Sequence, residues 1–443
     1  MKLCPDNPNL LFGQLLVPDM RYSPQVVAGR SPWLAAGMLL VFRLSSAQEA
    51  LRNSMTNQVS AESRRAQFES AAYTFKSGDF RFLATTSLGV DWNDNVNLSP
   101  GNAESDFIIM PTAGFTATYP ITDRNLLQAN VTFGYSKYVE HDELSTWYIQ
   151  SGSELSFDIG IKEWNINLHD RVSYVQDAGQ QALVAGPGAA SYGTFQNTVG
   201  ILASWGLKDF NLSLGYDHLN LLSTTSTFDS ENHDSEMFSA RAGFQVHPKV
   251  NTGIELTTTF TTYDQQLLNN NVNYSAGVYA DWQVSQALHI QPRGGYTIYN
   301  FQQTSQTVQT SDLNSWYLDL NATHDVTKAI SYSIDVGHEI QLGVQSDLTE
   351  DWYVRPAVTW KFIKALAFNT SLSYQNGKQG IGNVAGNLTE KYEWLGANFS
   401  LSHALSSRFT LSLNYRLTIR SSDIPSNEYT QNMVGLLIAY TPK

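Results

Sequence analysis

From residue 80 onward, apolar and polar side chains alternate along the chain. The clearest example is 408–420, where odd positions are apolar and even positions are polar. Successive side chains of a β-strand point to opposite faces, so the pattern predicts strands with one face against hydrocarbon or a core and the other against water. The same rule predicts eighteen strands: 80–92, 107–119, 126–138, 147–161, 164–176, 194–206, 209–222, 236–247, 250–263, 272–284, 287–301, 312–326, 329–342, 351–363, 366–375, 391–404, 408–420 and 432–440.

The lengths and connections of these segments indicate their environment. The segments have roughly 9 to 15 residues, whereas about 9–11 tilted residues cross a bilayer and a soluble strand has about 5–6. Short connections such as 162–163 and 406–407 alternate with long polar ones such as 177–193 and 421–431. An even-stranded barrel with both termini in the periplasm has this arrangement.

The pattern therefore predicts an all-β fold, a transmembrane antiparallel β-barrel of about 18 strands, with 16 as the neighbouring count, short periplasmic turns and long outer loops. Two soluble folds fit less well. A β-sandwich of this size would be divided by linkers, and a β-solenoid would show a fixed short repeat. The sequence has neither feature.

The N-terminal segment is typical of a secretory signal. Residues 33–42 form the longest apolar run, with arginines before it and small residues after it. This order predicts a signal peptide over 1–47 that is removed from the mature chain; the alternative is a short buried helix. We expect 48–78 to form a periplasmic segment, either a short amphipathic helix or a disordered tail, and 79–443 to form the barrel.

Composition excludes several classes of protein. A mean hydropathy of −0.25 and the lack of a long apolar run exclude a helical membrane protein. The net charge of −13 offers no basic field, so we expect no nucleic-acid partner. The single cysteine, Cys4, excludes a disulfide framework and cysteine-based metal sites.

The last predicted strand carries a candidate assembly signal. Gly435 is followed at the third and fifth positions by Ile438 and Tyr440. This spacing resembles the C-terminal β-signal that hands outer-membrane barrels to the barrel-assembly machinery. Many such proteins end on the aromatic residue, whereas here 441–443 follow it. The alternative is an ordinary strand with a terminal aromatic residue.

The first predicted strand and its turn resemble the opening of the putative β-barrel porin 2 family of bacterial outer-membrane barrels. That opening is a strand ending in glycine, a hydrophobe, an acid and an aromatic residue, followed by an acidic and amide-rich turn. The matching residues are Gly89, Val90, Asp91, Trp92, Asp94, Asn95 and Val96, with Asn93 in place of the first turn acid. The resemblance implies a porin-like barrel, and some members of the family accompany exopolysaccharide systems.

The candidate catalytic and metal-binding motifs lack the residues or the structural setting that such sites require. The nine histidines include no pair at helical ligand spacing. Asp91, Asn93 and Asn95 have the first spacing of a calcium loop, but Val96 stands in place of the required glycine. The glycines at 380–386 fall in a predicted loop, away from any helix start. His218 and His338 have outward parity without an identifiable serine partner, so we expect no enzyme and no cofactor.

Charged residues on the predicted strands are expected to face the lumen, because a charge against lipid at the bilayer midplane costs about 2–4 kcal/mol. Acids are predicted to line one arc of the wall and bases the next, either to create a transverse field or merely to pair with one another. The acids are Asp281, Asp319, Asp335 and Glu339, and the bases are Arg355, Lys361, Arg408, Arg416 and Arg420.

These features favour an outer-membrane channel, surrounded by lipid, for the diffusion of small hydrophilic solutes, because 16 to 18 strands leave an aqueous lumen. Two alternatives stay open. One is an outer-membrane component of an exopolysaccharide export or assembly system, docked through 48–78. The other is a structural or adhesive barrel that acts through its outer loops. The sequence leaves the oligomeric state and the solute or polysaccharide open.

Overall fold

The computed structural model describes residues 72–442 except 187, 303–311, 345 and 385–388. These residues form one antiparallel sheet of 19 strands. The strands are β1 (Phe75–Ser77), β2 (Phe80–Asn93), β3 (Asp106–Pro120), β4 (Leu126–Tyr138), β5 (Thr146–Ile161), β6 (Trp164–Val175), β7 (Thr194–Leu207), β8 (Phe210–Ser223), β9 (His233–His247), β10 (Val250–Tyr263), β11 (Asn270–Gln283), β12 (Leu288–Gln302), β13 (Leu313–Asp325), β14 (Ile330–Leu342), β15 (Ser346–Ile363), β16 (Leu366–Val384), β17 (Glu390–Ala404), β18 (Phe409–Ser422) and β19 (Tyr429–Tyr440). Short 3-10 turns in the connections are η2 (Asp142–Leu144), η3 (Ala178–Gln180), η4 (Ala189–Ser191), η5 (Ser226–Glu231) and η6 (Pro425–Asn427).

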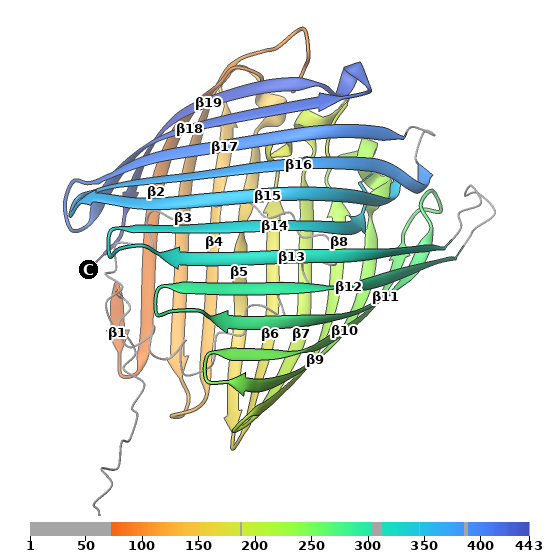
Figure 1. Ribbon diagram of the computed structural model, residues 1–443. Helices are drawn as coiled ribbons and strands as arrows, with labels where there is room; N and C mark the ends of the chain where they lie inside the picture. Colours follow the sequence, from red (N-terminus) through yellow and green to blue (C-terminus); the bar gives the residue numbers. More distant parts are fainter. Residues whose placement is uncertain (1–71, 187, 303–311, 345, 385–388, 443) are drawn as a thin grey trace, which may run out of the picture.

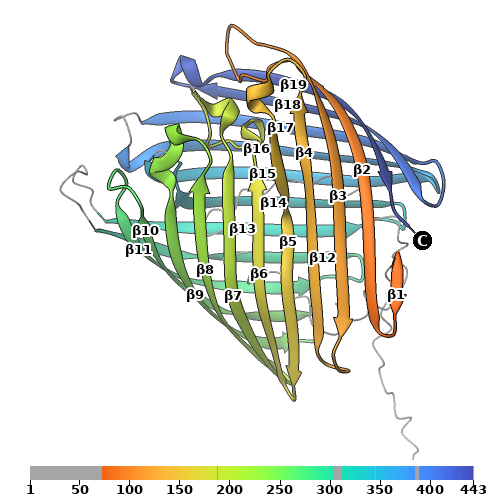
Figure 2. The same ribbon diagram turned by 180° about the vertical axis from the view of Figure 1, so that it is seen from behind.

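Strands β2 to β19 close the sheet into a barrel. Each strand pairs with the next, and β19 pairs with β2, with Tyr440 opposite Thr86. The short β1 pairs with the start of β2, below the part that β19 reaches. Figures 1 and 2 show the two walls, whose strands cross in projection because the strands of a closed barrel are tilted. The predicted antiparallel barrel of 18 strands is confirmed.

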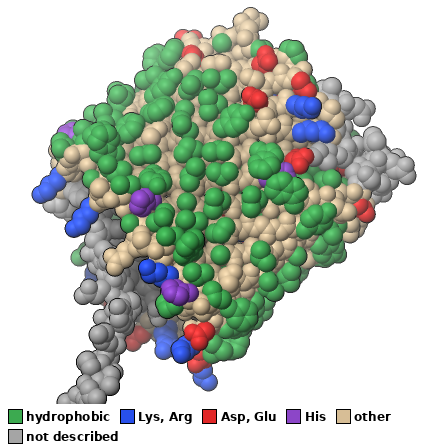
Figure 3. All heavy atoms as spheres, viewed as in Figure 1, with side chains coloured by type: hydrophobic (Ala, Val, Ile, Leu, Met, Phe, Trp, Pro, Cys, Tyr) green, Lys and Arg blue, Asp and Glu red, His purple; other side chains and the backbone are tan. Residues whose placement is uncertain are grey.

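The two faces of the wall have the polarity that strand alternation predicts. On β18, Leu411 and Leu413 are exposed on the outer surface, whereas Ser412 and Thr418 are buried on the inner side. Figure 3 shows hydrophobic side chains across the middle of one wall and charged side chains toward its edges. An apolar outer band of this kind matches the hydrocarbon region of a membrane.

The connections at the two ends of the barrel differ. At one end they are short, as at 162–163 and 364–365, and at the other end they include 94–105, 176–193 and 224–232. We name these the periplasmic end and the outer end. The chain enters β2 and leaves β19 at the periplasmic end.

Strands β15 and β16 are longer than predicted. The sequence pattern placed them at 351–363 and 366–375, and the glycine-rich stretch from Gly380 was interpreted as a loop. The structure instead continues β16 to Val384, with Gln379 paired to Glu390 on β17. The prediction was wrong because above the apolar band neither face of the strand is apolar, so backbone pairing continues without an alternating pattern.

The predicted signal peptide, 1–47, lies outside the described residues, as does most of the predicted segment 48–78. The described end of that segment contains β1, so the sheet begins at Phe75. Among the described residues, no helix is long and apolar enough to cross a membrane.

Candidate channel lumen

The inner wall carries a row of charged and tyrosine side chains across β9 to β15, which we call the Arg–Tyr row. Its members occupy inward positions, and alternate outward positions carry exposed apolar residues such as Val278, Trp316 and Trp352. Backbone pairing places Arg241 opposite Glu255, Tyr279 opposite Arg293, and Arg293 opposite Asp319. The row consists of Arg241, Glu255, Tyr279, Arg293, Tyr317, Asp319, Tyr353 and Arg355.

At the β9 to β13 end of the row, tyrosine rings and one carboxylate hold two guanidinium groups. The guanidinium carbon of Arg241 lies 3.4 Å from the ring centre of Tyr279. Glu255 lies 3.6 Å from Arg293 and accepts a 3.0 Å hydrogen bond from the hydroxyl of Tyr317. Cation–π contact with Tyr279 orients Arg241, and the ion pair with Glu255 orients Arg293.

At the β13 to β15 end, the same residue types recur. Tyr353 donates a 2.7 Å hydrogen bond to Asp319, and the guanidinium of Arg355 lies 4.2 Å from the Tyr353 ring centre. Asp335 lies 3.8 Å from Arg355 and directly opposite it in the sheet. The row therefore alternates cations, anions and aromatic rings along an arc of the wall.

Glycines make room for the tyrosines of the row. A Cβ atom on Gly277 would lie 2.1 Å from the Tyr317 hydroxyl oxygen, and one on Gly337 would lie 2.4 Å from the Tyr353 hydroxyl oxygen. Each ring thus lies against bare backbone of a neighbouring strand. This packing holds the rings against the wall, which leaves the lumen wider than rings projecting toward its axis would.

The structure places the predicted acidic lumen residues beside specific partners. Asp281 on β11 lies 2.6 Å from His289 and accepts a 3.0 Å hydrogen bond from Gln291. Asp319 and Asp335 belong to or adjoin the Arg–Tyr row. Glu339 is buried on β14, opposite Asp351 in the register.

The predicted basic residues are distributed differently. Arg416 and Arg420 lie on β18, and Lys361 lies half-buried near the periplasmic end of β15. Arg408 is exposed in the turn before β18, one residue outside the strand to which the sequence assigned it.

The expected separation into an acidic arc and a basic arc is not found among the described residues. Arg293 on β12 stands within the arc expected to be acidic, and Arg355 lies within reach of Asp335. Sequence reasoning missed Arg241, Glu255 and Arg293, although the inward parity of their strands was a sufficient signal.

The connection 176–193, between β6 and β7, folds inward across the outer mouth to the far wall. Arg416 on β18 donates a 2.8 Å hydrogen bond to Asp177. Arg420 donates to the carbonyl of Ala182 at 3.2 Å and to Glu390 at 2.5 Å. Gln379 on β16 donates to the carbonyl of Leu183 at 2.9 Å. These residues belong to strands far around the barrel from β6, so the connection narrows the lumen.

A small hydrophobic cluster fixes the connections at the mouth. Leu98, Tyr192, Phe228 and Val344 come from four different outer connections and are buried together, with Tyr429 of β19 completing the group. Burial of such side chains contributes about 1.5–3 kcal/mol each. The inward fold of 176–193 therefore has its own apolar core.

Beside this cluster lies a buried carboxyl group. The Tyr192 hydroxyl donates a 2.8 Å hydrogen bond to Glu231, the last residue of η5. Desolvation by burial raises the pKa of Glu231 to about 8. At neutral pH the side chain is therefore mostly protonated, which suits its apolar surroundings.

The opening motif of the barrel lies at the seam between β2 and β19. Asp94 accepts a 2.6 Å hydrogen bond from the backbone N–H of Asn432, and Asn95 donates to the carbonyl of Thr430 at 2.9 Å. These side chains therefore bond the chain to β19 just beyond the end of β2. Asp91 lies opposite Gly435, and a Cβ on Gly435 would be 2.0 Å from its carboxylate oxygen.

The other residues of the candidate assembly signal lie on β19. Ile438 is exposed on the outer face, and the Tyr440 ring lies 5.2 Å from that of Phe409 at the periplasmic end. Aromatic residues at this level are typical of the interfacial girdle of membrane barrels. The assembly role of Gly435, Ile438 and Tyr440 stays a prediction.

The two outward histidines are bonded to carboxylates. His218 lies 2.9 Å from Glu236, and His338 lies 3.0 Å from Glu350 and 3.0 Å from the Trp316 carbonyl oxygen. Among the described residues, no group of three or more His, Cys, Asp or Glu side chains is placed to hold a metal ion.

A family model described as Putative beta-barrel porin 2 matches residues 71–440. No curated protein sequence matches the chain. Similar solved structures include OccK5 (OpdH) of Pseudomonas aeruginosa, with 10% identity over 82% of this chain and 99% of that chain and a TM-score of 0.46. They also include OccAB3 of Acinetobacter baumannii (11% identity, 82% and 99% covered, TM-score 0.46) and the outer membrane channel DcaP of Acinetobacter baumannii (12% identity, 84% and 100% covered, TM-score 0.42). Because the family model spans the barrel from β1 to β19, the chain belongs to the Putative beta-barrel porin 2 family and is a β-barrel of the bacterial outer membrane.

Proposed function

We propose that this barrel is a diffusion channel for small hydrophilic solutes, with the Arg–Tyr row as the surface that those solutes meet. The observation that carries the proposal is the polar inner wall of a closed 18-strand barrel. A barrel of this size leaves an aqueous lumen. Membership of a porin family favours a channel over an enzyme.

The alternating charges of the row suit polar and zwitterionic solutes. Adjacent cations and anions can replace hydration on both ends of such a solute, and the flat tyrosine rings offer weak apolar contact. Since Arg355 and Asp335 are only partly exposed, the solute would meet oriented pairs rather than single free charges. We therefore infer weak ion selectivity with a preference set by small charge differences.

Planar-bilayer recording tests the proposal. The wild-type protein should form open channels, and Arg241→Gln with Arg293→Gln and Arg355→Gln should move the reversal potential in a salt gradient toward cation selectivity, because three inward positive charges are lost. Asp281→Asn removes a negative charge instead, so this control should move the reversal potential toward anion selectivity. Channels that never open would refute the function, and an unchanged reversal potential would remove the row from the conduction path.

A further inference from the structure

A polar groove lies on the outward face of the wall near the outer end of β15 to β18. Its volume is about 730 Å³. Two parallel rows of side chains line it, and the rows lie two residues apart along each strand. The upper row is Glu350, Lys378, Lys391 and Asp423, and the lower row is Trp352, Asn376, Glu393 and Ser421.

The groove stands directly above the apolar band. One step further along the strands, the outward positions are all apolar: Val354, Tyr374, Leu395 and Ile419. Val354 and Tyr374 are exposed on the outer surface. A groove that begins where the apolar band ends lies at the level of lipid headgroups rather than in the path of solutes through the lumen.

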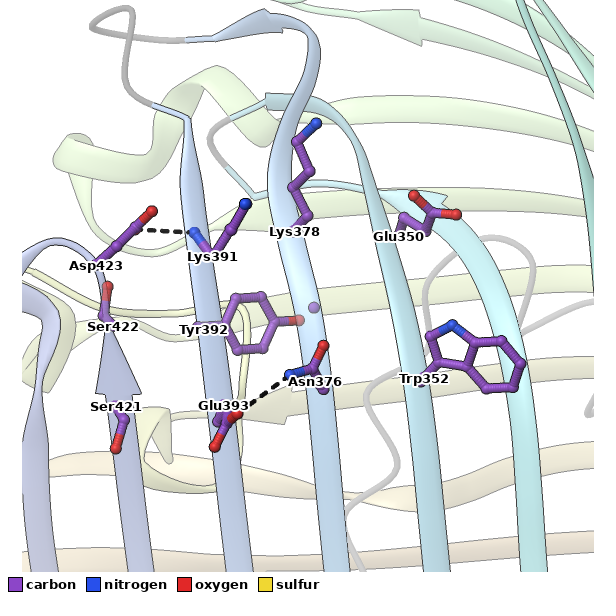
Figure 4. A pocket seen from close by; sticks show the side chains of 11 residues that line it. Glu350, Trp352, Asn376, Lys378, Lys391, Tyr392, Glu393, Ser421, Ser422 and Asp423 are labelled. Atoms are coloured by element: carbon purple, nitrogen blue, oxygen red, sulfur yellow. Dashed lines mark hydrogen bonds between the residues drawn. The ribbon is translucent and has the colours of Figure 1, made fainter.

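Two lysines face each other in the groove. Lys378 on β16 and Lys391 on β17 are directly paired in the register, and Figure 4 shows their side chains on neighbouring strands. Like charges directly opposite on neighbouring strands are destabilising. Among the described residues, no carboxylate lies within ion-pair distance of either ammonium group.

The carboxylates nearby have other partners. Glu350 lies 3.0 Å from His338, whose ring stacks on Trp316 and contacts the tilted ring of Trp352. Asp423 accepts a 2.9 Å hydrogen bond from the backbone N–H of Lys391. The remaining acid, Glu393, accepts from Asn376 at 3.4 Å. Among the residues that the structure describes, the two ammonium groups therefore have no carboxylate to neutralise them.

We propose that this groove binds the phosphorylated headgroup of a glycolipid in the outer leaflet of the membrane. Paired ammonium groups match a phosphate, and the amide, carboxylate and hydroxyl groups of the lower row match sugar hydroxyls. The exposed indole of Trp352 lies where an amphipathic ring meets the membrane interface. The acyl chains of the same lipid would lie along the apolar outward positions below.

Native mass spectrometry of the full barrel in lipid nanodiscs tests this binding. The nanodiscs contain a zwitterionic phospholipid and, as probe, a minor fraction of an acylated glucosamine disaccharide that carries phosphate. The wild type should retain the probe, and Lys378→Gln with Lys391→Gln should weaken retention on the order of thirtyfold, because each lysine near an anionic headgroup contributes about one factor of five.

The matched control removes the same charge elsewhere. Lys208→Gln with Lys249→Gln changes two exposed lysines in turns at the periplasmic end and should leave retention of the probe unchanged. Lys378→Arg with Lys391→Arg should retain the probe, which separates loss of charge from loss of folding. Equal loss in the control pair, or full retention by the Lys378/Lys391 pair, would overturn the proposal.

Two further arms identify the source of the phosphate. The dephosphorylated probe should not be retained. Inorganic phosphate in solution should not displace the phosphorylated probe; displacement would overturn the assignment to a lipid. Channel conductance of the Lys378→Gln/Lys391→Gln variant should equal that of the wild type, so failure of lipid binding and failure of the channel function are separable.

Discussion

At the scale of single residues, the direction in which a strand side chain points determines whether an apolar or a polar residue is tolerated there. Leu413 is half exposed on the outer face of β18, whereas Asn414 is directed inward and pairs with Ser400 and Gly435 in the register. A one-residue step along the strand moves a side chain from lipid to lumen. Intrinsic strand preference is the same for a new arginine at either position, so any difference reports the facing direction.

Leu413→Arg should therefore impair folding, because it places a charge against hydrocarbon at a cost of about 2–4 kcal/mol near the bilayer midplane. Asn414→Arg should fold and alter only ion selectivity. The heat-modifiable mobility of the barrel in gel electrophoresis measures the folded fraction. If both variants folded equally well, the orientation of the strand would be wrong.

Glu231 gives a second prediction at this scale, one of pH dependence. Its pKa is raised to about 8 from an ordinary value of 4.5, so the folded mouth holds a proton that the unfolded chain releases. Stability of the mouth should therefore fall as pH rises from about 4.5 through 8 and level off above that. Hydrogen exchange in 224–232 measures it. Glu231→Gln should show no such change; a wild-type mouth insensitive to pH would contradict the assignment.

At the scale of elements, the seam between the first and last strands of the barrel combines three devices. At the periplasmic end, β1 pairs with β2, and further along, β19 pairs with β2. Beyond the end of β2, the side chains of Asp94 and Asn95 form hydrogen bonds with the backbone of Asn432 and Thr430 on β19. The family motif and the glycine of the candidate assembly signal meet here, where Asp91 occupies the space above Gly435. The distinctive residues of the first and the last strand of the barrel therefore lie together at the seam that closes it.

The assembly role of the last strand can be tested at this seam. Tyr440→Ser removes an interfacial ring that packs on Phe409 and should reduce insertion into the outer membrane several-fold, whereas deletion of 441–443 should have little effect. The amount of folded barrel in the outer-membrane fraction measures insertion. Greater harm from the tail deletion would show that the signal does not end at Tyr440.

At the scale of the whole molecule, different interactions hold the wall of the barrel and the connection that covers its mouth. The wall is held by continuous backbone pairing, and the connection 176–193 is held across the lumen by Arg416, Arg420 and Gln379. Reversing the charges of Arg416 and Arg420 would therefore release the connection 176–193 as well as change the electric field in the lumen. The Arg–Tyr row lies on β9 to β15, whereas the attachments of that connection lie on β16 and β18, so the row is the better place to alter selectivity alone.

Release of the connection should widen the channel. Arg420→Ala combined with Glu390→Gln removes the hydrogen bond to Ala182 without leaving a buried unpaired charge. Single-channel conductance should rise, with more frequent transitions between levels, because 176–193 loses an attachment to the far wall. Lys208→Gln, in an exposed turn at the periplasmic end and outside the Arg–Tyr row, serves as the control. Unchanged conductance in the double variant would mean that the connection does not limit flow.

The wall of the barrel could be predicted from the sequence. Strand number, strand positions and the alternation of faces follow from a period of two, which is a local property of neighbouring residues. The ends of β15 and β16 escaped this reasoning because outside the apolar band both faces are polar. The fold of the mouth, the partners of the lumen charges and the outward groove became visible only in the structure. Arg416 meets Asp177, and Lys378 meets Lys391, only because closure of the barrel and the register of its strands bring them together, and no local pattern encodes such contacts.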